Sequence, residues 1–391
     1  MSVSELLFLV SFLVIFYTYL GYGILIWFFV LIKKMATRRI YPVNNFYEPA
    51  VTLIVPCFNE ADIMEAKIAN CRSLNYPADK LSFIFITDGS TDDFVSVLKD
   101  HPDISALHED QRAGKTATEN RAMLFVTTPI VIFSDANTFL NSESVKNIVR
   151  HFADKHVGCV SGEKRIIADK TDSISAAGES IYWKYESILK KLDAALNCTV
   201  GAAGELVAFR SDLYKDLPED TLLDDFMQSM QIAANGYRIA YEPEAFSLET
   251  ASLNVKEELK RKRRIAAGNW QAMKRLTGIL RFTKTPLLLF QYISHKVLRW
   301  SVAPFLLILI FFLNILLAIN STPVYTTLLI LQAGFYLIAI AGYFLQSKKT
   351  RFKILFVPYY FCVMNYAALA GFAKFLSDTQ QGTWDKAKRR T

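Results

Sequence analysis

The sequence lacks charged side chains over one long stretch near its start: no Asp, Glu, Lys or Arg occurs at residues 6–32. This apolar run exceeds the roughly 20 residues that a helix needs to span a bilayer. The leader before it contains no basic residue, and the run is too long for the apolar part of a cleavable signal peptide. We therefore expect a membrane-spanning helix here, which excludes a wholly soluble protein.

Cysteine is also sparse, and no two cysteines have the Cys-x-x-Cys spacing of a zinc or redox motif. Four of the five fall in the part of the chain that we expect in the cytosol, where thiols stay reduced. The sequence has no long internal repeat, no low-complexity tract and no nucleic-acid-binding motif. We interpret all the cysteines as packing residues: Cys57, Cys71, Cys159, Cys198 and Cys362.

Basic residues are present in excess, 44 Lys and Arg against 37 Asp and Glu, for a formal net charge of +7. They cluster at 33–39, 260–264, 348–353 and 386–390, each next to an apolar segment. This pattern is typical of membrane orientation and of contact with anionic lipid head groups, and it argues against nucleic acid as a partner. Because the first cluster follows the first apolar run at once, the positive-inside rule places the next segment in the cytosol and the N-terminus outside.

Hydropathy divides the chain into three expected regions: an N-terminal transmembrane helix with a basic linker (1–40), a cytosolic domain (41–284) and C-terminal interfacial and transmembrane helices with a basic tail (285–391). In the middle region short apolar runs alternate with helical patterns, which predicts an α/β domain with a largely parallel sheet. The expected strands are 51–57, 83–87, 130–134, 158–161, 207–209 and 238–241, and the expected early helices are 61–74, 116–126 and 142–152.

The C-terminal region contains apolar segments of unequal strength. Residues 301–319 and 324–345 are expected to be two spans joined by a short turn. Residues 287–300 mix apolar and basic side chains, which favours an amphipathic helix at the membrane surface. Residues 354–376 include Asn365 and Lys374, so both a third span and a re-entrant or interfacial segment stay open.

Polar residues follow three of the expected strands at the point where each strand ends. Asn59 and Glu60 follow the first strand, Asp88 the second and Asp135 the third. In open parallel sheets the ligand crevice lies beyond the carboxyl ends of the strands. Asn59 alone would suit a helix cap and Asp88 an ordinary turn. Three such strand ends in register predict a ligand site instead.

Three further patterns carry chemistry. Gly114-Lys115 opens a helix and would either hold a diphosphate or cap a surface helix. The oxygens of Asp135 and Asn137 are ligands that Mg²⁺ or Mn²⁺ prefers, although Asn137 brings no charge and is also a common turn residue. Asp224-Asp225 begins a helix, where acids often only complement the helix dipole, yet a positioned carboxylate can also remove a proton from a hydroxyl.

The order and spacing of these motifs resemble glycosyltransferase family 2, in particular its membrane-integrated branch of cellulose, chitin, hyaluronan and poly-N-acetylglucosamine synthases. The resemblance runs from residue 51 to about residue 268 and extends to the membrane flanks. It implies an α/β, GT-A-like (Rossmann-like) nucleotide-sugar-binding domain plus transmembrane helices. The implied reaction is inverting transfer of a sugar from a nucleotide-sugar, with a UDP-sugar favoured, to a growing polysaccharide or a lipid-linked acceptor.

The resemblance also implies roles for single residues. Asp225 is the implied general base, with Asp224 as the fallback, and Arg264 would stabilise the charge on the leaving diphosphate. Asp135 and Asn137 would hold the Mg²⁺ or Mn²⁺ ion on that diphosphate. The remaining candidates for nucleotide contact are Asn59, Glu60, Asp88, Lys115 and Arg263.

The chain departs from the synthase pattern at three positions: Asn137 replaces a second metal-binding acid, Arg261 a glutamine and Ile265 a tryptophan. A polysaccharide product and a single sugar added to a membrane glycolipid therefore both stay open. A loop of small residues at 201–205 resembles the acceptor loop of the family. A non-catalytic nucleotide-sugar-binding scaffold is the alternative from another class of protein. A transporter is disfavoured because the expected spans at 6–32, 301–319 and 324–345 carry no charge. We expect an integral protein of the plasma or inner membrane, in contact with its lipids.

Overall fold

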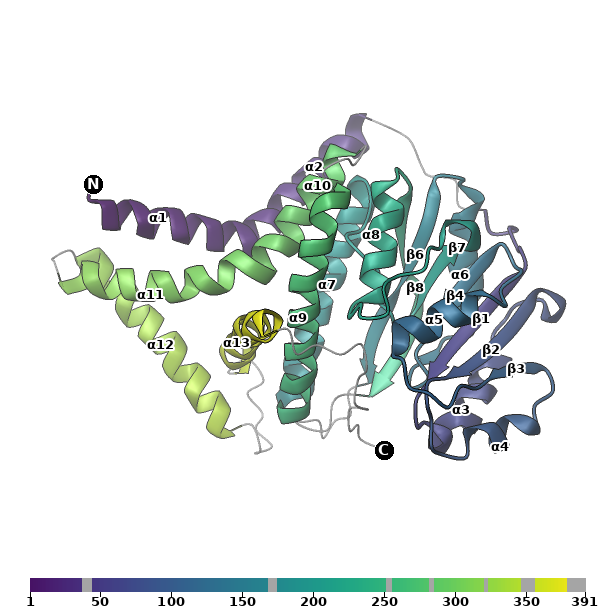
Figure 1. Ribbon diagram of the computed structural model, residues 1–391. Coiled ribbons are helices and arrows are strands. Elements are labelled where there is room, and N and C mark those ends of the chain that lie inside the picture. Colours follow the sequence, from purple (N-terminus) through teal and green to yellow (C-terminus); the bar gives the residue numbers. More distant parts are fainter. Residues whose placement is uncertain are drawn as a thin grey trace.

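The computed structural model describes residues 1–36, 44–167, 174–250, 255–280, 285–319, 323–345 and 356–377. It places a sheet domain at one end and long apolar helices at the other (Figure 1). The basic positions Arg38 and Arg39, the cluster at 348–353 and the tail at 386–390 lie outside the described residues.

The sheet has eight strands in the order β3-β2-β1-β4-β7-β6-β8-β5. The pairs β3–β2, β2–β1, β1–β4 and β6–β8 are parallel, whereas β7 runs antiparallel to both β4 and β6, and β5 antiparallel to β8. The expected largely parallel α/β sheet is thus confirmed, with two reversed strands. The strands are β1 (Val51–Cys57), β2 (Leu81–Thr87), β3 (Ile104–Leu107), β4 (Ile130–Phe133), β5 (Phe139–Leu140), β6 (Val157–Ile167), β7 (Val207–Arg210) and β8 (Arg238–Thr250).

Apolar side chains on both faces of the sheet form its core, because β1 and β4 are buried along their whole length. On one face β1 packs against Met64 and Ile68, and on the other β4 packs against Met230 and Leu276. The helices associated with the strands are α3 (Ala61–Arg72), η2 (Ala78–Lys80), α4 (Phe94–Lys99), α5 (Lys115–Met123), α6 (Ser144–Val149), η3 (Arg150–Ala153), η4 (Ser211–Leu213) and α8 (Asp224–Ala234).

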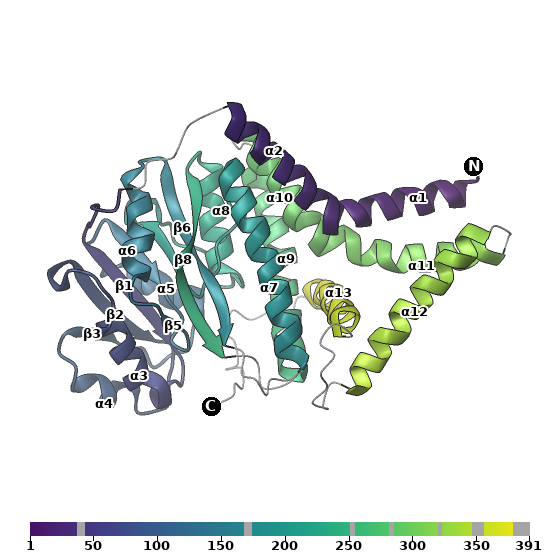
Figure 2. The ribbon, with the colours of Figure 1, turned by 180° about the vertical axis from the view of Figure 1, so that it is seen from behind.

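Two long helices, α7 (Ile174–Leu196) and α9 (Val255–Leu280), stand between the sheet and the apolar helices (Figures 1 and 2). Helix α7 packs on α2, and α9 packs on α13. The remaining helices are α1 (Val3–Phe16), η1 (Tyr17–Gly21), α2 (Tyr22–Ala36), α10 (Pro286–Tyr292), η5 (Ile293–Val302), α11 (Ala303–Ile319), α12 (Pro323–Leu345) and α13 (Phe356–Leu376).

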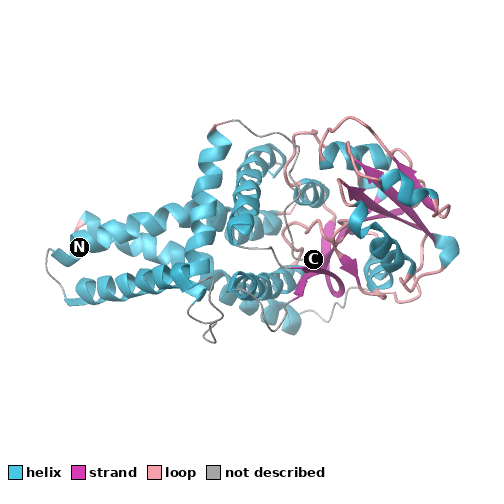
Figure 3. Ribbon diagram, turned by 90° about the horizontal axis from the view of Figure 1, so that it is seen from below, coloured by secondary structure: helices cyan, strands magenta, loops and turns pink. Residues whose placement is uncertain are grey.

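Three helices in the described part of the chain are long and apolar enough to cross a membrane: Val3–Ala36, Pro286–Ile319 and Pro323–Leu345. Helices α1, α11 and α12 extend away from the sheet domain (Figure 1), and the view from below shows helices alone at one end and the strands towards the other (Figure 3). They expose large apolar side chains, for example Phe312 at 62% and Leu331 at 65%. Helix α13 is not among these three candidates.

Residues 287–300 differ from the expected surface helix. They continue without a break into α11, and His295 and Lys296 are only 2% and 7% exposed. Lys296 and Arg299 both form ion pairs with Glu186 of α7. The basic side chains therefore face the buried Glu186 rather than lipid head groups, because α7 supplies a partner from a distant part of the sequence.

Candidate functional site

The loops after β1 and β2 are tied together at the edge of the sheet. Asn59 has a positive φ of 53°, and its Oδ1 accepts a hydrogen bond of 2.8 Å from the Thr91 amide. The Asn59 amide donates to Ser90 Oγ at 3.0 Å, and the Ala61 amide donates to Asp92 Oδ2 at 2.7 Å. Asn59 and Asp92 therefore shape the edge of the site. The N-cap of α3 is the buried Glu60, one residue after Asn59.

Asp88 organises the segment that leads into α5. Its carboxylate is fully buried and accepts hydrogen bonds from the amides of Ala113 at 2.7 Å and Gly114 at 2.8 Å. Gly114 has a φ of 106°, which a side chain would disfavour, and it is the N-cap of α5. Asp88 thus acts through this backbone, and it places Lys115 at the start of the helix.

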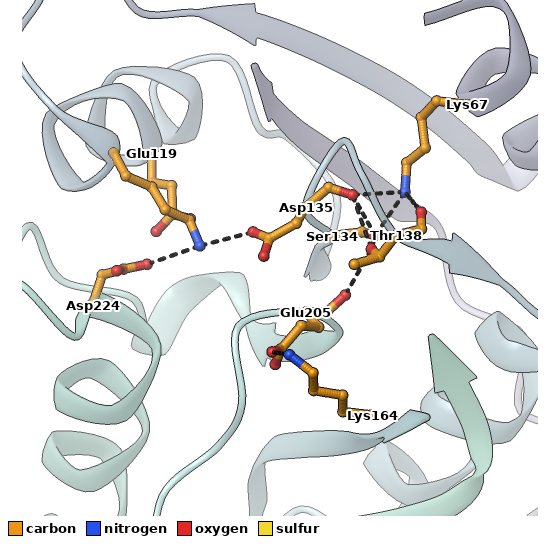
Figure 4. A network of polar contacts seen from close by, with 9 residues as sticks. Lys67, Glu119, Ser134, Asp135, Thr138, Lys164, Glu205 and Asp224 are labelled. Carbon is orange, nitrogen blue, oxygen red and sulfur yellow. Dashed lines mark hydrogen bonds and ion pairs between the residues drawn. The ribbon is translucent and has the colours of Figure 1, made fainter. Parts of the chain in front are cut away.

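Lys115 is the centre of an ionic cluster, and Figure 4 labels its three acidic partners, Asp135, Asp224 and Glu119. Its Nζ lies 3.0 Å from Asp135 Oδ1, 3.6 Å from Asp224 Oδ2 and 3.6 Å from Glu119 Oε1. Burial lowers the pKa of the Lys115 ammonium, but the surrounding carboxylates outweigh this and raise the pKa well above its usual value. Burial, together with the Asp224 charge, raises the pKa of Glu119 well above its usual value. The structure thus brings together Lys115, Asp135 and Asp224 from three separate motifs.

Lys67 fixes the loop that carries Asp135, a role that we did not predict. The Lys67 side chain is fully buried, and its Nζ donates to Ser134 Oγ at 2.9 Å and to the carbonyls of Asp135 at 3.0 Å and Thr138 at 2.6 Å (Figure 4). The sequence signal is its position on α3, on the same face as the buried Met64 and Cys71. A lysine on the inward face of a helix needs buried acceptors.

The reversed strand β7 brings the small-residue loop at 201–205 to the same edge. Since Phe133 of β4 pairs with Val207 of β7, the residues before β7 lie beside those after β4. A methyl group at Gly204 would lie 3.1 Å from Asp225 Oδ2 and 3.3 Å from Lys115 Nζ. The Asp225 carboxylate, the Lys115 ammonium and the Gly204 backbone therefore meet at one point.

The two acids at the start of α8 differ in charge state. Burial, with the neighbouring Asp224 charge, raises the pKa of Asp225 from 3.8 to about 7. Burial also acts to raise the pKa of Asp224, but Lys115 outweighs it and the pKa is lowered. Asp224 is therefore held as the anion, whereas Asp225 exchanges its proton near neutral pH.

Helix α9 packs against the start of α8 through Gly268, where a Cβ would lie 2.8 Å from Leu223 Cγ. One turn earlier, burial lowers the pKa of Arg264, and the nearby charges of Asp224, Asp135 and Asp225 oppose this shift. Arg264 therefore faces the carboxylates. Arg263 is exposed and does not join them, since it lies on another face of the helix. Arg261 pairs with Glu258 at 3.0 Å and with Glu249 at 3.8 Å.

The cluster suits a divalent cation that takes part of its ligands from phosphate and water rather than from the protein. Four acids, Asp135, Asp224, Asp225 and Glu119, surround Lys115 and offer carboxyl oxygens to a cation. Asp135 and Asn137 are both partly exposed, as ligands that reach a bound ion must be. In the described residues no group of three or more His, Cys, Asp or Glu is placed to hold a metal ion by itself. Mg²⁺ commonly uses one or two carboxylates and completes its shell with phosphate and water.

A cavity of about 590 Å³ opens on the other side of Asp225. Its wall extends from Asp225 and the loop at 201–205 to α7, α9, η1, η5 and α13. Aromatic and aliphatic side chains form most of this wall, for example Trp183, Phe226 and Phe361. The cavity therefore connects the ionic cluster with the apolar helices.

Comparisons with known proteins agree with this arrangement. Residues 52–215 match the model of the family described as Glycosyl transferase family 2. A poly-beta-1,6-N-acetyl-D-glucosamine synthase of Staphylococcus aureus is 24% identical over 200 residues, which cover 49% of this chain and 48% of the synthase. An O-antigen chain rhamnosyltransferase of Salmonella typhimurium is 27% identical over 222 residues, 54% of this chain and 69% of the transferase. The match thus spans about half the length of the synthase.

Among solved structures, a mannosyltransferase from Pyrobaculum calidifontis, in complex with GDP-mannose and Mn²⁺, resembles this chain with a TM-score of 0.72. The sequences are 24% identical, and the likeness covers 96% of this chain and 100% of the other. The expected GT-A-like α/β domain with apolar helices is confirmed.

Proposed function

We propose, from the match of residues 52–215 to the Glycosyl transferase family 2 model, that this chain is a membrane-bound enzyme that transfers a sugar from a nucleotide-sugar with inversion at the anomeric carbon. The observation that carries the proposal is Asp225. Its carboxyl group, with a pKa raised to about 7, lies between the Lys115 cluster and the cavity. A general base is most effective when its pKa is near the working pH.

In the proposed reaction, an acceptor hydroxyl oxygen in the cavity attacks the anomeric carbon of the donor sugar. The bond from that carbon to the diphosphate oxygen breaks, and the hydroxyl proton passes to Asp225. The nucleoside diphosphate leaves with the bonding electron pair. Lys115 and Arg264 provide positive charge on the leaving-group side, where it stabilises the developing negative charge.

Asp135 and Asn137 are the residues that would hold Mg²⁺ or Mn²⁺ on the diphosphate, and the ion would supply further positive charge there when bound. Asp88 supports the backbone of the segment that carries Lys115, while Asn59 and Glu60 lie at the nucleotide edge of the sheet. Asp224 keeps its charge beside Lys115 and raises the pKa of Asp225. Each of these polar residues thus has a distinct role in the proposed reaction.

A donor screen tests the proposal. The full chain in nanodiscs is incubated with UDP-, GDP- or dTDP-sugars, Mg²⁺ or Mn²⁺, and a membrane extract as the source of acceptor, and the released nucleotide is measured. The resemblance favours UDP-sugars, and the GDP-mannose in the Pyrobaculum enzyme makes GDP-sugars the second arm. We expect metal-dependent release with one nucleotide, and about a 10- to 100-fold loss in the Asp135→Ala variant.

Nucleotide binding without metal, together with no release from any donor, would contradict the proposal and favour a binding scaffold. Sizing of the labelled product then separates a polymer from a single addition. Arg261 is held in ion pairs by Glu258 and Glu249, and Ile265 lines the cavity. Arg261 and Ile265 stand where the synthase pattern has a glutamine and a tryptophan. We therefore propose a product of one or few added sugars.

A further inference from the structure

From the cavity behind Asp225, we propose that the acceptor is a phosphorylated lipid, whose phosphate binds beside Lys190 and whose chain extends between the apolar helices. This inference rests on the proposed function, since it names the acceptor class for the same site. Three features of the described residues support it: a buried lysine without an acidic partner, an aromatic ring surrounded by cations, and a continuous apolar wall.

Lys190 is the first feature. It lies on α7, is 6% exposed and lines the cavity. Within the described residues no carboxylate lies within ion-pair distance of its ammonium, which instead contacts the faces of Trp183 at 5.8 Å and Tyr241 at 5.6 Å. A buried charge without a paired ion destabilises the folded protein. An anionic ligand would remove that cost.

Trp183 is the second feature. The ammonium groups of Lys164 and Lys262 also lie over its ring, at 5.2 and 5.7 Å. Those two lysines are paired, Lys164 with Glu205 and Glu249, and Lys262 with Glu258. Of the three lysines around the Trp183 ring, Lys190 is therefore the one whose positive charge no acid in the described part of the chain compensates. Another cation on this wall, Arg299, also has a buried Nη1 without a hydrogen-bond partner among the described residues.

The third feature is the wall beyond the lysines. Leu20 of η1, Trp300 of η5 and Phe361 of α13 line the same cavity, and η1 and η5 belong to candidate membrane spans. A free sugar would leave this apolar surface without a partner, whereas a hydrocarbon chain would cover it. Since Asp225 lines the same cavity, a sugar hydroxyl attached to the phosphate would reach the base. The base, the cation and the apolar side chains thus line one cavity, and this combination complements a lipid phosphate that carries an acceptor sugar.

The test measures equilibrium binding of radiolabelled farnesyl phosphate to the full chain in phosphatidylcholine nanodiscs, with empty nanodiscs subtracted. Farnesol tests the need for charge, and inorganic phosphate as a competitor tests the need for the chain. We expect saturable binding of farnesyl phosphate, at least about tenfold weaker binding of farnesol, and no displacement by millimolar inorganic phosphate.

The variants are Lys190→Met, which keeps the length and removes the charge, and Lys190→Arg, which keeps the charge. Lys191→Met is the matched control, because Lys191 is the exposed neighbour on the same helix. We expect about a tenfold loss for Lys190→Met, recovery in Lys190→Arg and no change in Lys191→Met. Ala368→Phe, which narrows the cavity at α13 without touching a charge, should also weaken binding by about tenfold if the chain lies there.

Equal binding of farnesol, an unchanged affinity in Lys190→Met with its thermal unfolding unaltered, or displacement by inorganic phosphate would each overturn the inference. If Lys190→Met does not fold, an unchanged affinity in Ala368→Phe would overturn it instead. A protein that binds farnesyl phosphate in this way, yet binds no nucleotide in the donor screen, would refute the proposed function and leave the lipid site standing. Nucleotide release without any binding of farnesyl phosphate would refute the lipid site and leave the proposed function standing.

Discussion

Two buried groups of charged residues differ in how completely their members are paired. At the junction of α7 with the apolar helices, Asp193 accepts hydrogen bonds from Tyr22 Oη at 2.5 Å, His295 Nδ1 at 2.5 Å and Gln291 Nε2 at 3.2 Å. At the proposed catalytic edge, the end of the sheet around Lys115, several acids share the Lys115 ammonium at distances of 3.0 to 3.6 Å, and Asp225 has a pKa raised to about 7. The Asp193 carboxylate is saturated by its donors and belongs to the architecture, whereas several acids at the catalytic edge share the single Lys115 ammonium.

The sharpest test of this contrast is Asp225→Asn. We expect sugar transfer to fall about 10²- to 10⁴-fold, because the acceptor proton loses its base, while nucleotide affinity changes little. The raised pKa also means that the folded protein favours protonated Asp225, so the stability from this group is lost as pH rises through about 7. At pH 8 the Asn variant should therefore unfold at a temperature no lower than the wild type, which excludes misfolding as the cause.

At the junction we expect a loss of stability without a loss of sugar transfer. Asp193→Ala leaves His295 and Tyr22 buried without their acceptor, and we expect the free energy of unfolding to fall by about 3 kcal/mol. Thermal unfolding in nanodiscs measures the change. The transfer rate per folded molecule should stay at the wild-type value, and a loss of rate with unaltered stability would erase the distinction between the two groups.

Gly204→Ala tests the crowding at the catalytic edge. The new methyl group would lie 3.1 Å from Asp225 Oδ2, so we expect about a tenfold loss of transfer from displacement of the carboxylate. Gly278→Ala is the matched control, because a Cβ there meets no atom within 4 Å. Equal rates in the two variants would show that Asp225 does not need its observed position.

Asp224→Asn should have the smallest effect. Removal of the Asp224 charge lowers the pKa of Asp225, because that charge repels the Asp225 anion. We expect the pH at which transfer is half-maximal to move below 7, and the rate at pH 8 to change by less than about tenfold. A loss as large as that of Asp225→Asn would instead identify Asp224 as the base.

The early part of the fold could be predicted because each strand is a short apolar run with polar residues at its end. Strand β1 has the expected bounds, and the loops after β1, β2 and β4 meet as expected from parallel pairing. The separation of Arg264 from Arg263 also follows from helical periodicity, since Arg264 shares a face with Gly268. Lys67 had a local signal as well, its place on the inward face of α3.

Other features depend on partners far away in the sequence. The basic residues of 287–300 suit a membrane surface until α7 supplies Glu186 and Asp193, more than 100 residues earlier. Lys190 is one of two adjacent lysines, and only the packing of α7 decides which of them faces the cavity. The raised pKa of Asp225 needs burial and the Asp224 charge together, and sequence alone gives only the second.

The dependence of transfer on pH tests the central claim most directly. With saturating donor, metal and membrane acceptor, we expect the wild-type rate to rise with pH through an apparent pKa near 7 and then to level off, because Asp225 must be ionised to accept the proton. The residual rate of Asp225→Asn should show no such rise. A wild-type profile that is flat from pH 5 to pH 8, or the same inflection in Asp225→Asn, would contradict the assignment of Asp225 as the base.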